Sequence, residues 1–239
     1  MKNIEVSIIL PTYNEKKNII PLIERLKNVL SEVNKEIIIV DDNSPDGTSE
    51  IIKTNLKEDN EVTLIVRNNE PGLANSIREG IFFSKGRIII VMDTDFNHNP
   101  DDVTLLYNIA KYTDMVIGSR FIFGGGMEDR FRYFLSFFFN LFVRLMIRSR
   151  IDDNLSGFFS INREKLLQLD FNKIFWGYGD YFFRLLFYAQ KKKFKIVQIP
   201  TLYKLRIYGE SKTNFFKTFK KYFFEIFKLW RLSWKIKKI

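Results

Sequence analysis

Three polar segments of the sequence carry side chains that can do chemistry together. They are residues 11–15 (PTYNE), 41–48 (DDNSPDGT) and 93–98 (DTDFNH), and each follows a short hydrophobic run. Asp93 and Asp95 flank a single residue, so both carboxylates can reach one pocket where a strand ends and the chain turns. Such oxygen ligands suit Mg²⁺ or Mn²⁺ shared with the phosphates of a substrate. Asn97, two residues further on, can add an amide oxygen to this metal site.

These acidic segments also have a plainer interpretation. Asp-x-Asp is common in turns, and Asp41 or Asp42 can be helix-capping acids, as can Asp46 or Thr48. The position of Asp93 and Asp95 after a hydrophobic run, with two other polar segments alongside, favours the functional interpretation.

The sequence lacks the signatures of several other sites. Its 239 residues include no cysteine and one histidine, His98, so a protein-only zinc site is not expected. There is no Gly-x-Gly-x-x-Gly motif after the first hydrophobic run and no Walker A loop. A phosphotransferase of the haloacid dehalogenase type needs Thr or Val where this chain has Asn97. What remains is an acidic edge that needs a cation to bind a phosphorylated ligand.

The elements that must position these side chains are short strands alternating with helices. Apolar, β-branched runs predict strands at 6–10, 36–40, 62–66, 87–92 and 115–119. Helical patterns lie between them at about 16–33, 46–56, 72–85 and 101–112. Uninterrupted hydrophobic strands of this kind predict a mostly parallel sheet with helices on both faces, so the first half is a Rossmann-like α/β unit.

This topology brings the three polar segments together. Parallel strands share one carboxyl edge, and ligands of open α/β sheets bind beyond that edge. The segments are about 30–50 residues apart in sequence, yet we expect them to converge in space.

The pattern changes beyond residue 120. A glycine run at 124–126 precedes a Phe-rich helical stretch at 130–149, a strand near 156–161, a helix near 177–191 and a strand near 195–201. We find no repeats and no linker rich in Pro, Gly or Ser that would separate two domains.

The net charge of +10 is unevenly distributed. Residues 1–120 have a net charge of −5, while residues 121–239 have a net charge of +15 and 22 of the 25 phenylalanines. Arginines among aromatics can stack on single-stranded RNA, but no RNA-recognition signature is present and helically spaced Phe suits lipid better. We therefore predict an anionic lipid surface, and not nucleic acid, as the partner of this half.

The C-terminal segment 214–238 is predicted to be an amphipathic helix with a cationic face. Its apolar residues recur at spacings of three and four at Phe215, Phe219, Tyr222, Ile226 and Trp230. Such a helix can dock on the protein's own core. Aromatics beyond one narrow stripe favour a membrane-surface anchor instead.

No transmembrane span or signal peptide is expected. The longest uncharged run, residues 133–143, has eleven residues, whereas a transmembrane helix needs about 18–20.

Five motifs in unbroken order resemble those of a known family. They are residues 10–15 (LPTYNE), 40–48 (VDDNSPDGT), 92–98 (MDTDFNH), 118–120 (GSR) and 206–212 (RIYGESK). Together they resemble glycosyltransferase family 2, in particular its dolichyl-phosphate mannose synthase branch, over about residues 4–213. The resemblance implies a GT-A type fold, a nucleotide-sugar donor, a polyprenyl-phosphate acceptor, Mg²⁺ or Mn²⁺ as cofactor, and inversion at the sugar carbon.

The resemblance also implies residue roles. The residues expected to hold the nucleoside are Pro11, Tyr13, Glu15, Val40 and Asp42, with Asp41 beside them. Asp93 and Asp95 match the metal-diphosphate pair, Thr94 the backbone contact to the donor, and Asn97 a third metal-side position. The expected cationic clamp on phosphates is Arg120, Arg206 and Lys212, which with Asp95 are the predicted catalytic residues.

Physical chemistry agrees with these roles. A departing nucleoside diphosphate develops negative charge that a metal ion and cationic side chains stabilise. A phosphomonoester acceptor has a second pKa near 6, so it is already an anion at neutral pH and needs no strong general base.

Two positions depart from the family pattern. Phe159 stands where the family has arginine, and Phe183 stands where glutamate is common. Both lie on the predicted acceptor side, so they bear on the acceptor and the donor sugar. We expect Asp153 to order its loop, and His98 to fix a turn by hydrogen bonds instead of binding metal.

The predicted organisation is a GT-A domain over 1–213, with a nucleotide-sugar half at 1–120 and an acceptor half at 121–213, followed by the membrane-surface helix at 214–239. The predicted activity is inverting, metal-dependent transfer of a hexose, mannose or glucose, to a polyprenyl (dolichyl) phosphate. GDP-mannose is the first donor considered and UDP-glucose the second. The protein is expected at the cytoplasmic face of a membrane as a peripheral protein, and a separate membrane-anchor subunit is left open. The alternatives are a family 2 enzyme acting on a growing glycan and a catalytically silent lipid-surface binding module.

Overall fold

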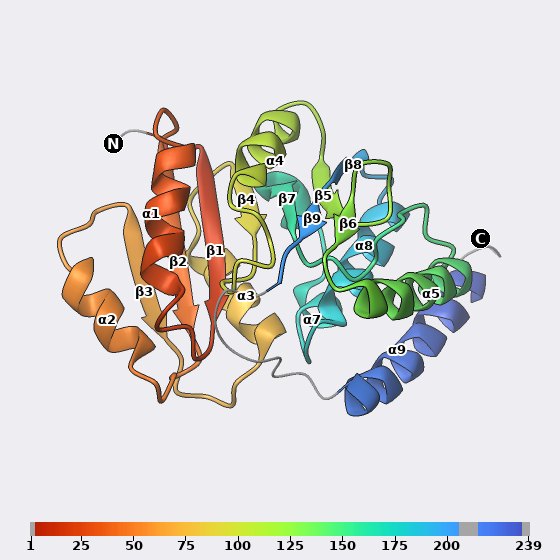
Figure 1. Cartoon of the computed structure of the whole chain (residues 1–239). Helices are drawn as coiled ribbons and strands as arrows, with labels where there is room; N and C mark the ends of the chain where they lie inside the picture. The colour runs from red at the N-terminus through yellow and green to blue at the C-terminus, as the bar shows by residue number, and fades with distance from the viewer. Residues whose placement is uncertain (1–2, 206–214, 236–239) are drawn as a thin grey trace.

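The central element is a mostly parallel seven-stranded sheet in the order β3-β2-β1-β4-β7-β5-β8 (Figure 1). The structure is a computed structural model that describes residues 3–205 and 215–235. The strands of the sheet are β1 (Val6–Thr12), β2 (Lys35–Asp41), β3 (Val62–Val66), β4 (Ile88–Val91), β5 (Met115–Ser119), β7 (Phe159–Asn162) and β8 (Ile196–Pro200). The predicted mostly parallel α/β sheet is confirmed.

The register of the inner strands explains why the polar segments meet. Thr12 at the end of β1 pairs with Asp41 at the end of β2. On the other side of β1, Ile9 pairs with Val91, so the chain after β4 also leaves the sheet near that edge. The carboxyl ends of the three strands therefore release their polar segments side by side.

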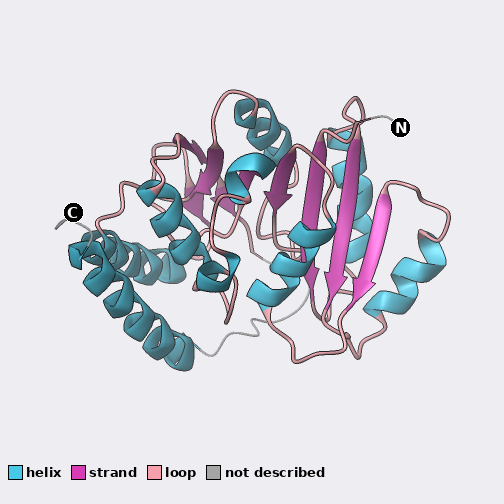
Figure 2. Ribbon diagram, turned by 180° about the vertical axis from the view of Figure 1, so that it is seen from behind, coloured by secondary structure: helices cyan, strands magenta, loops and turns pink. Residues whose placement is uncertain are grey.

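Helices cover both faces of the sheet (Figures 1 and 2). The helices α1 (Ile19–Val29), α2 (Thr48–Asn55) and α4 (Asp102–Ala110) pack on the face to which β1 contributes Ile8. The other face, to which β1 contributes Ile9, is covered by α3 (Leu73–Phe83), α6 (Arg163–Leu166), α7 (Phe171–Ile174) and α8 (Tyr181–Lys191). Because successive side chains of a strand point to opposite faces, the continuous apolar runs supply both cores.

Some elements were not evident from the sequence. β7 is antiparallel to both of its neighbours, β4 and β5. A hydrophobic run does not determine strand direction, so this reversal could not be predicted. The two-residue strands β6 (Gly126–Met127) and β9 (Leu202–Tyr203), which pair in parallel, and the four-residue helices α6 and α7 are too short to show a period.

The Phe-rich helix α5 (Arg130–Ile147) and the C-terminal helix α9 (Phe215–Lys235) lie against each other at one end of the molecule (Figure 1). With α8 they form a third hydrophobic cluster, whose buried residues are Phe139, Val143, Ile147, Phe183, Phe187, Ile226 and Leu229. The sequence pattern favoured a lipid-facing anchor over a docked helix, but one face of α9 is docked on the protein.

Both helices also keep exposed aromatics. On α5, Phe131 is 74% exposed and Phe138 is 51% exposed, and on α9, Phe224 is 58% exposed. Within the described ranges of the chain, no helix combines the length and apolar character needed to cross a bilayer.

Candidate active site

A cavity of about 220 Å³ opens at the carboxyl edge of the sheet. Its lining includes seven of the predicted site residues, namely Pro11, Tyr13, Glu15, Asp42, Asp93, Thr94 and Asp95. They come from the segments that follow β1, β2 and β4, which is the convergence expected from the parallel topology.

The segment after β1 is bound to the segment after β2 through backbone donors. The N–H of Asn14 donates to Ser44 Oγ at 2.8 Å, and the N–H of Glu15 donates to Thr48 Oγ1 at 3.0 Å. Asp46 Oδ1 in turn accepts from the N–H of Thr48 at 3.0 Å, at the start of α2. These bonds hold Glu15 at the cavity wall.

Asp42 is buried and its carboxylate is fully engaged. It forms an ion pair with Arg67, and it accepts from the N–H of Gly72 at 2.7 Å and from Ser76 Oγ at 2.8 Å. Arg67 directly follows β3, so the rule that found the other segments also applies to it. Sequence reasoning missed Arg67 because it considered only three of the strand ends.

Val40 and Asp41 precede Asp42 in the chain and are fully buried, and they do not line the cavity. The Asp41 carboxylate accepts from the N–H of Ser44 at 3.0 Å and from Ser49 Oγ at 2.6 Å. In this structure Asp41 holds the loop and the start of α2.

Asp93 and Asp95 both line the cavity, with different exposure. The Asp93 side chain is 47% exposed, whereas Asp95 is 6% exposed. Asp95 accepts from the N–H of Asn97 at 3.1 Å and from Asn97 Nδ2 at 3.0 Å. Because the amide nitrogen of Asn97 is used in this bond, its oxygen is the atom that suits a metal.

This donor set fits Mg²⁺ or Mn²⁺, which prefer carboxylate and carbonyl oxygens. Among the residues that the structure describes, no group of three or more Asp, Glu or His side chains could hold a metal alone.

His98 is fully buried and forms a hydrogen bond with the backbone of this segment. Its Nδ1 accepts from the N–H of Asp93 at 3.0 Å, and its Nε2 lies 2.8 Å from Tyr203 Oη. A neutral ring that accepts at Nδ1 carries its proton on Nε2, so His98 donates to Tyr203. The ring also stacks on Phe158 with centroids 4.8 Å apart. His98 fixes the turn, as its residue type predicted.

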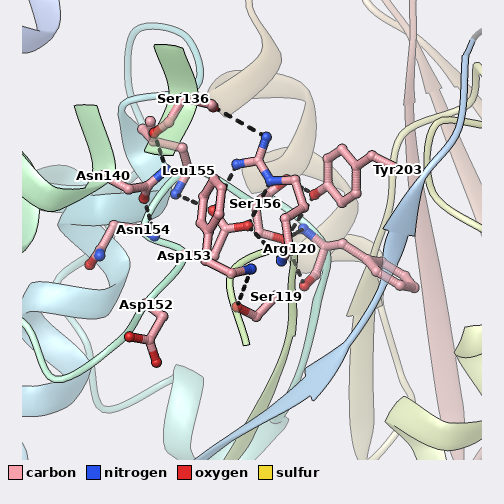
Figure 3. A network of polar contacts seen from close by, with 12 residues as sticks. Ser119, Arg120, Ser136, Asn140, Asp152, Asp153, Asn154, Leu155, Ser156 and Tyr203 are labelled. Carbon is pink, nitrogen blue, oxygen red and sulfur yellow. Dashed lines mark hydrogen bonds and ion pairs between the residues drawn. The ribbon is translucent and has the colours of Figure 1, made fainter. Parts of the chain in front are cut away.

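Arg120, at the end of β5, is buried with Asp153 (Figure 3). Nε and Nη2 of Arg120 donate to the two carboxylate oxygens of Asp153, each at 2.7 Å. The N–H of Arg120 also donates to Asp153, at 3.1 Å. Burial by itself lowers the pKa of Arg120, but the Asp153 carboxylate outweighs burial and raises that pKa above its ordinary value. Asp153 therefore orders its loop, as expected.

The same network connects Arg120 to Ser136 and to Tyr203 (Figure 3). Its Nη1 lies 3.4 Å from Ser136 Oγ on α5, and its guanidinium lies over the Tyr203 ring, 4.5 Å from the centroid. The Tyr203 hydroxyl donates to Ser156 O at 2.7 Å and contacts His98. Arg120 itself does not line the cavity; the Tyr203 ring contacts both Arg120 and His98, and its centroid is 4.8 Å from that of the His98 ring.

Comparison with known proteins assigns the chain to a family. The family model described as Glycosyl transferase family 2 matches residues 7–169. The chain belongs to glycosyl transferase family 2. The resemblance found in the sequence motifs is confirmed.

Relatives of this family 2 glycosyltransferase are similar over most of its length. The dolichol-phosphate mannosyltransferase of Pyrococcus furiosus is 33% identical over 98% of this chain, and the match covers 66% of that protein. The dolichol-phosphate mannosyltransferase of Saccharomyces cerevisiae is 32% identical over 89% of this chain and 82% of its own. The undecaprenyl-phosphate mannosyltransferase of Micrococcus luteus is 30% identical over 87% of both chains.

Solved structures establish the GT-A fold of the glycosyltransferase. Glucosyl-3-phosphoglycerate synthase from Mycobacterium tuberculosis, in complex with Mn²⁺, UDP and phosphoglyceric acid, has a TM-score of 0.69 at 18% identity. The match covers 89% of this chain and 73% of that one. The same enzyme in complex with Mg²⁺ and UDP has a TM-score of 0.63 at 19% identity, covering 87% of this chain and 72% of that one.

The cavity of the glycosyltransferase has further walls that sequence reasoning did not include in the site. They are formed by Thr12, Pro71, Gly72, Leu73, Ser76 and Tyr178. Tyr178 belongs to the segment 177–180 (GYGD), which resembles part of a segment of the family, and this partial resemblance was the available signal. Arg206 and Lys212, predicted as part of the phosphate clamp, lie outside the described residues.

Proposed function

We propose that this glycosyltransferase transfers a hexose, with inversion, from a nucleoside diphosphate to a polyprenyl monophosphate at a membrane surface. The observation that carries the proposal is the cavity that joins the nucleoside-side residues to Asp93 and Asp95. The names of the relatives, which are dolichol-phosphate and undecaprenyl-phosphate mannosyltransferases, support mannose and a polyprenyl acceptor. We place GDP-mannose first as donor and UDP-glucose second.

On the donor side, Pro11, Tyr13 and Glu15 form one wall of the cavity with Asp42. Asp93 and Asp95, with the amide oxygen of Asn97, would hold Mg²⁺ or Mn²⁺. When bound, the metal supplies positive charge that stabilises the departing diphosphate. Val40 and Asp41 support this wall from within the sheet.

On the acceptor side, the residue roles are electrostatic. Arg120 is held in its charged form by Asp153 and reaches Ser136 of α5. Because Arg120 is buried and does not line the cavity, we propose that it acts on the acceptor side through the positions of Asp153 and Ser136, with Arg206 and Lys212 contacting the phosphates directly. An acceptor phosphate is already anionic at neutral pH, so the attack requires no proton removal by the protein.

We propose that α5 and α9 contact the lipid surface. These helices combine exposed Phe131, Phe138 and Phe224 with arginines such as Arg132, which is also exposed. The cytoplasmic leaflet carries a negative surface potential that attracts such cations by about 1 kcal/mol each. We therefore propose peripheral binding at a cytoplasmic membrane face, in which the exposed aromatics contact the lipid directly.

A transfer assay tests the proposal. Radiolabelled GDP-mannose and UDP-glucose, each with Mn²⁺, are offered to polyprenyl phosphate and to glycan acceptors. We expect transfer to polyprenyl phosphate, with GDP-mannose the better donor. Transfer to a glycan alone would identify an enzyme acting on growing glycans. Absence of both transfer and donor hydrolysis, in a protein that binds vesicles, would identify a silent lipid-binding module.

A thermal-shift panel of GDP- and UDP-sugars with Mn²⁺ decides the nucleotide independently. A ligand that binds only the folded state raises the apparent stability by mass action. We expect the larger rise in Tm with the guanine nucleotide.

A further inference from the structure

The loop between α7 and α8 forms one wall of the donor cavity through Tyr178. The loop has a defined conformation. Gly177 has a φ of 78°, in the left-handed region that favours glycine, and the N–H of Tyr178 donates to Asp180 Oδ1 at 2.8 Å. The position of Tyr178 therefore depends on what holds this loop.

A buried arginine holds the loop from inside. Arg184 of α8 is 1% exposed, and its Nε donates to Ile174 O at 2.9 Å. Its other nitrogens bond to Trp176 O and to the Asp180 carboxylate. The guanidinium also lies over the Trp176 ring, 3.9 Å from its centroid. One side chain thus joins both ends of the loop.

The C-terminal helix reaches the same loop at two points. Glu225 of α9 is 8% exposed, and its Oε2 lies 3.8 Å from Nη1 of Arg184. The Tyr222 hydroxyl lies directly against the backbone of Gly179. This contact is tight, because a Cβ atom placed on Gly179 would lie 2.4 Å from the Tyr222 hydroxyl oxygen.

The Tyr222 hydroxyl stays neutral in this position. Burial raises its pKa well above the ordinary value, and the nearby Asp180 carboxylate raises it further. The ring is held by packing against Phe139 of α5 and Phe183 of α8, with centroids 6.3 Å and 5.6 Å away. Tyr222 is therefore a rigid support for the Gly179 backbone.

We propose that Tyr222 and Glu225 are positioning residues through which α9 holds Tyr178 in the cavity. The active site is then complete only when α9 is docked on the protein. The inference rests on the proposed function. The same helix presents Phe224, 58% exposed, on its outer side. A lipid surface that engages the outer side of α9 stabilises the seated helix, and this in turn stabilises the catalytic arrangement of the loop.

A double-mutant cycle across the Gly179–Tyr222 contact tests the inference. Gly179→Ala should lower kcat by about tenfold or more, because small displacements of a positioning group are costly. In a Tyr222→Phe background the added methyl fits, since the nearest remaining ring atom, Cζ, lies 3.6 Å away. We therefore expect the double variant to equal Tyr222→Phe alone, which itself loses severalfold in kcat. An equal effect of Gly179→Ala in both backgrounds would overturn the inference.

The readout must separate positioning from loss of structure. Affinity for the nucleoside diphosphate with Mn²⁺ should stay unchanged in Tyr222→Phe and Glu225→Gln, because the residues from β1 and β2 form that wall. A fall of affinity and kcat together, in proportion to a lower Tm, would refute a positioning role. Tyr112→Phe is the matched control, since Tyr112 is 87% exposed and distant in sequence from these elements.

Two acceptors distinguish this inference from the proposed function. A short-chain, water-soluble polyprenyl phosphate and a long-chain one in vesicles are compared with wild type and Tyr222→Phe. We expect Tyr222→Phe to lower kcat on both while vesicle binding is retained. Wild type inactive on both acceptors would refute the proposed function. Wild type active on both, and Tyr222→Phe equally active on the soluble acceptor, would refute the inference alone.

Discussion

Asp153 and Arg120 form a bidentate ion pair that is buried. The two N–O distances are 2.7 Å, and the residues are 0% and 4% exposed. Arginine does not lose its proton in proteins, so the positive charge beside Tyr203 is set by geometry and not by pH. Removal of the carboxylate would leave this charge buried without a counterion.

Asp153→Asn should therefore destabilise the fold strongly. Breaking one side of a buried ion pair costs about 3–5 kcal/mol in the free energy of unfolding. Asp152→Asn is the control, because its partner Arg144 is 45% exposed and such a pair is worth about 1 kcal/mol or less. Urea denaturation of both variants measures the difference, and similar losses would show that the buried pair is not special.

Asp95→Ala should abolish transfer without unfolding the protein. Under the proposed function Asp95 is one of the carboxylates that hold the metal, so its loss removes stabilisation of the leaving diphosphate, and we expect kcat to fall by at least about 100-fold. The Mn²⁺-dependent thermal shift with nucleoside diphosphate should disappear, while circular dichroism stays that of wild type. Asp101→Ala, which removes an exposed partner of Arg25, should keep activity. Normal turnover of Asp95→Ala would refute the metal site.

Tyr203→Phe should weaken the proposed metal site. The substitution leaves His98 Nε2 and Ser156 O without the hydroxyl that both of them contact. A buried polar group without a partner lowers the free energy of unfolding by about 1–3 kcal/mol. Because His98 also holds the N–H of Asp93, we expect a higher Mn²⁺ concentration for half-maximal activity. A Mn²⁺ titration checks this. An unchanged titration curve would limit Tyr203 to a structural role.

Asp46 should contribute a pH-dependent part of the stability. Burial raises its pKa, but hydrogen bonds from Thr48 and from the N–H of Lys16 outweigh burial, and the folded-state pKa lies below the ordinary value. The stabilisation is thus present above the ordinary carboxyl pKa and is lost as the pH falls through the lower folded value.

Asp46→Asn should accordingly be less stable than wild type by about 1 kcal/mol at neutral pH. The difference should shrink as the pH falls below about 4. Chemical denaturation at several pH values measures it, and a difference that grows with acidity would contradict the sign.

Phe131→Ser combined with Phe138→Ser should weaken membrane binding. Each side chain is exposed and would bury apolar area worth about 2 kcal/mol in lipid. We expect at least tenfold weaker flotation with anionic vesicles and little change in Tm. Phe82→Ser is a control of the same chemistry, because Phe82 is 81% exposed on α3. If the wild-type protein fails to bind vesicles at any salt concentration, the lipid-surface proposal falls.

Much of the fold was predictable because its signals are local. The runs at 62–66 and 115–119 coincide with β3 and β5, since short apolar runs with β-branched residues favour strands. The convergence of Glu15, Asp42 and Asp93 followed from the parallel topology alone. The direction of β7 and the short strands β6 and β9 have no local signal, because pairing depends on partners far along the chain.

The candidate site was likewise predictable only in part from the sequence. Sequence by itself determined which chemical groups are available: carboxylate and amide oxygens, polar residues at one sheet edge, and a basic aromatic half. Only the tertiary structure decided which charges neutralise each other, as in the pairs Arg120–Asp153 and Arg67–Asp42, and which face of α9 is docked. The physical reason is that residue type and spacing are properties of neighbouring positions. Burial and charge pairing are set by contacts between distant segments, which exist only once the chain has folded.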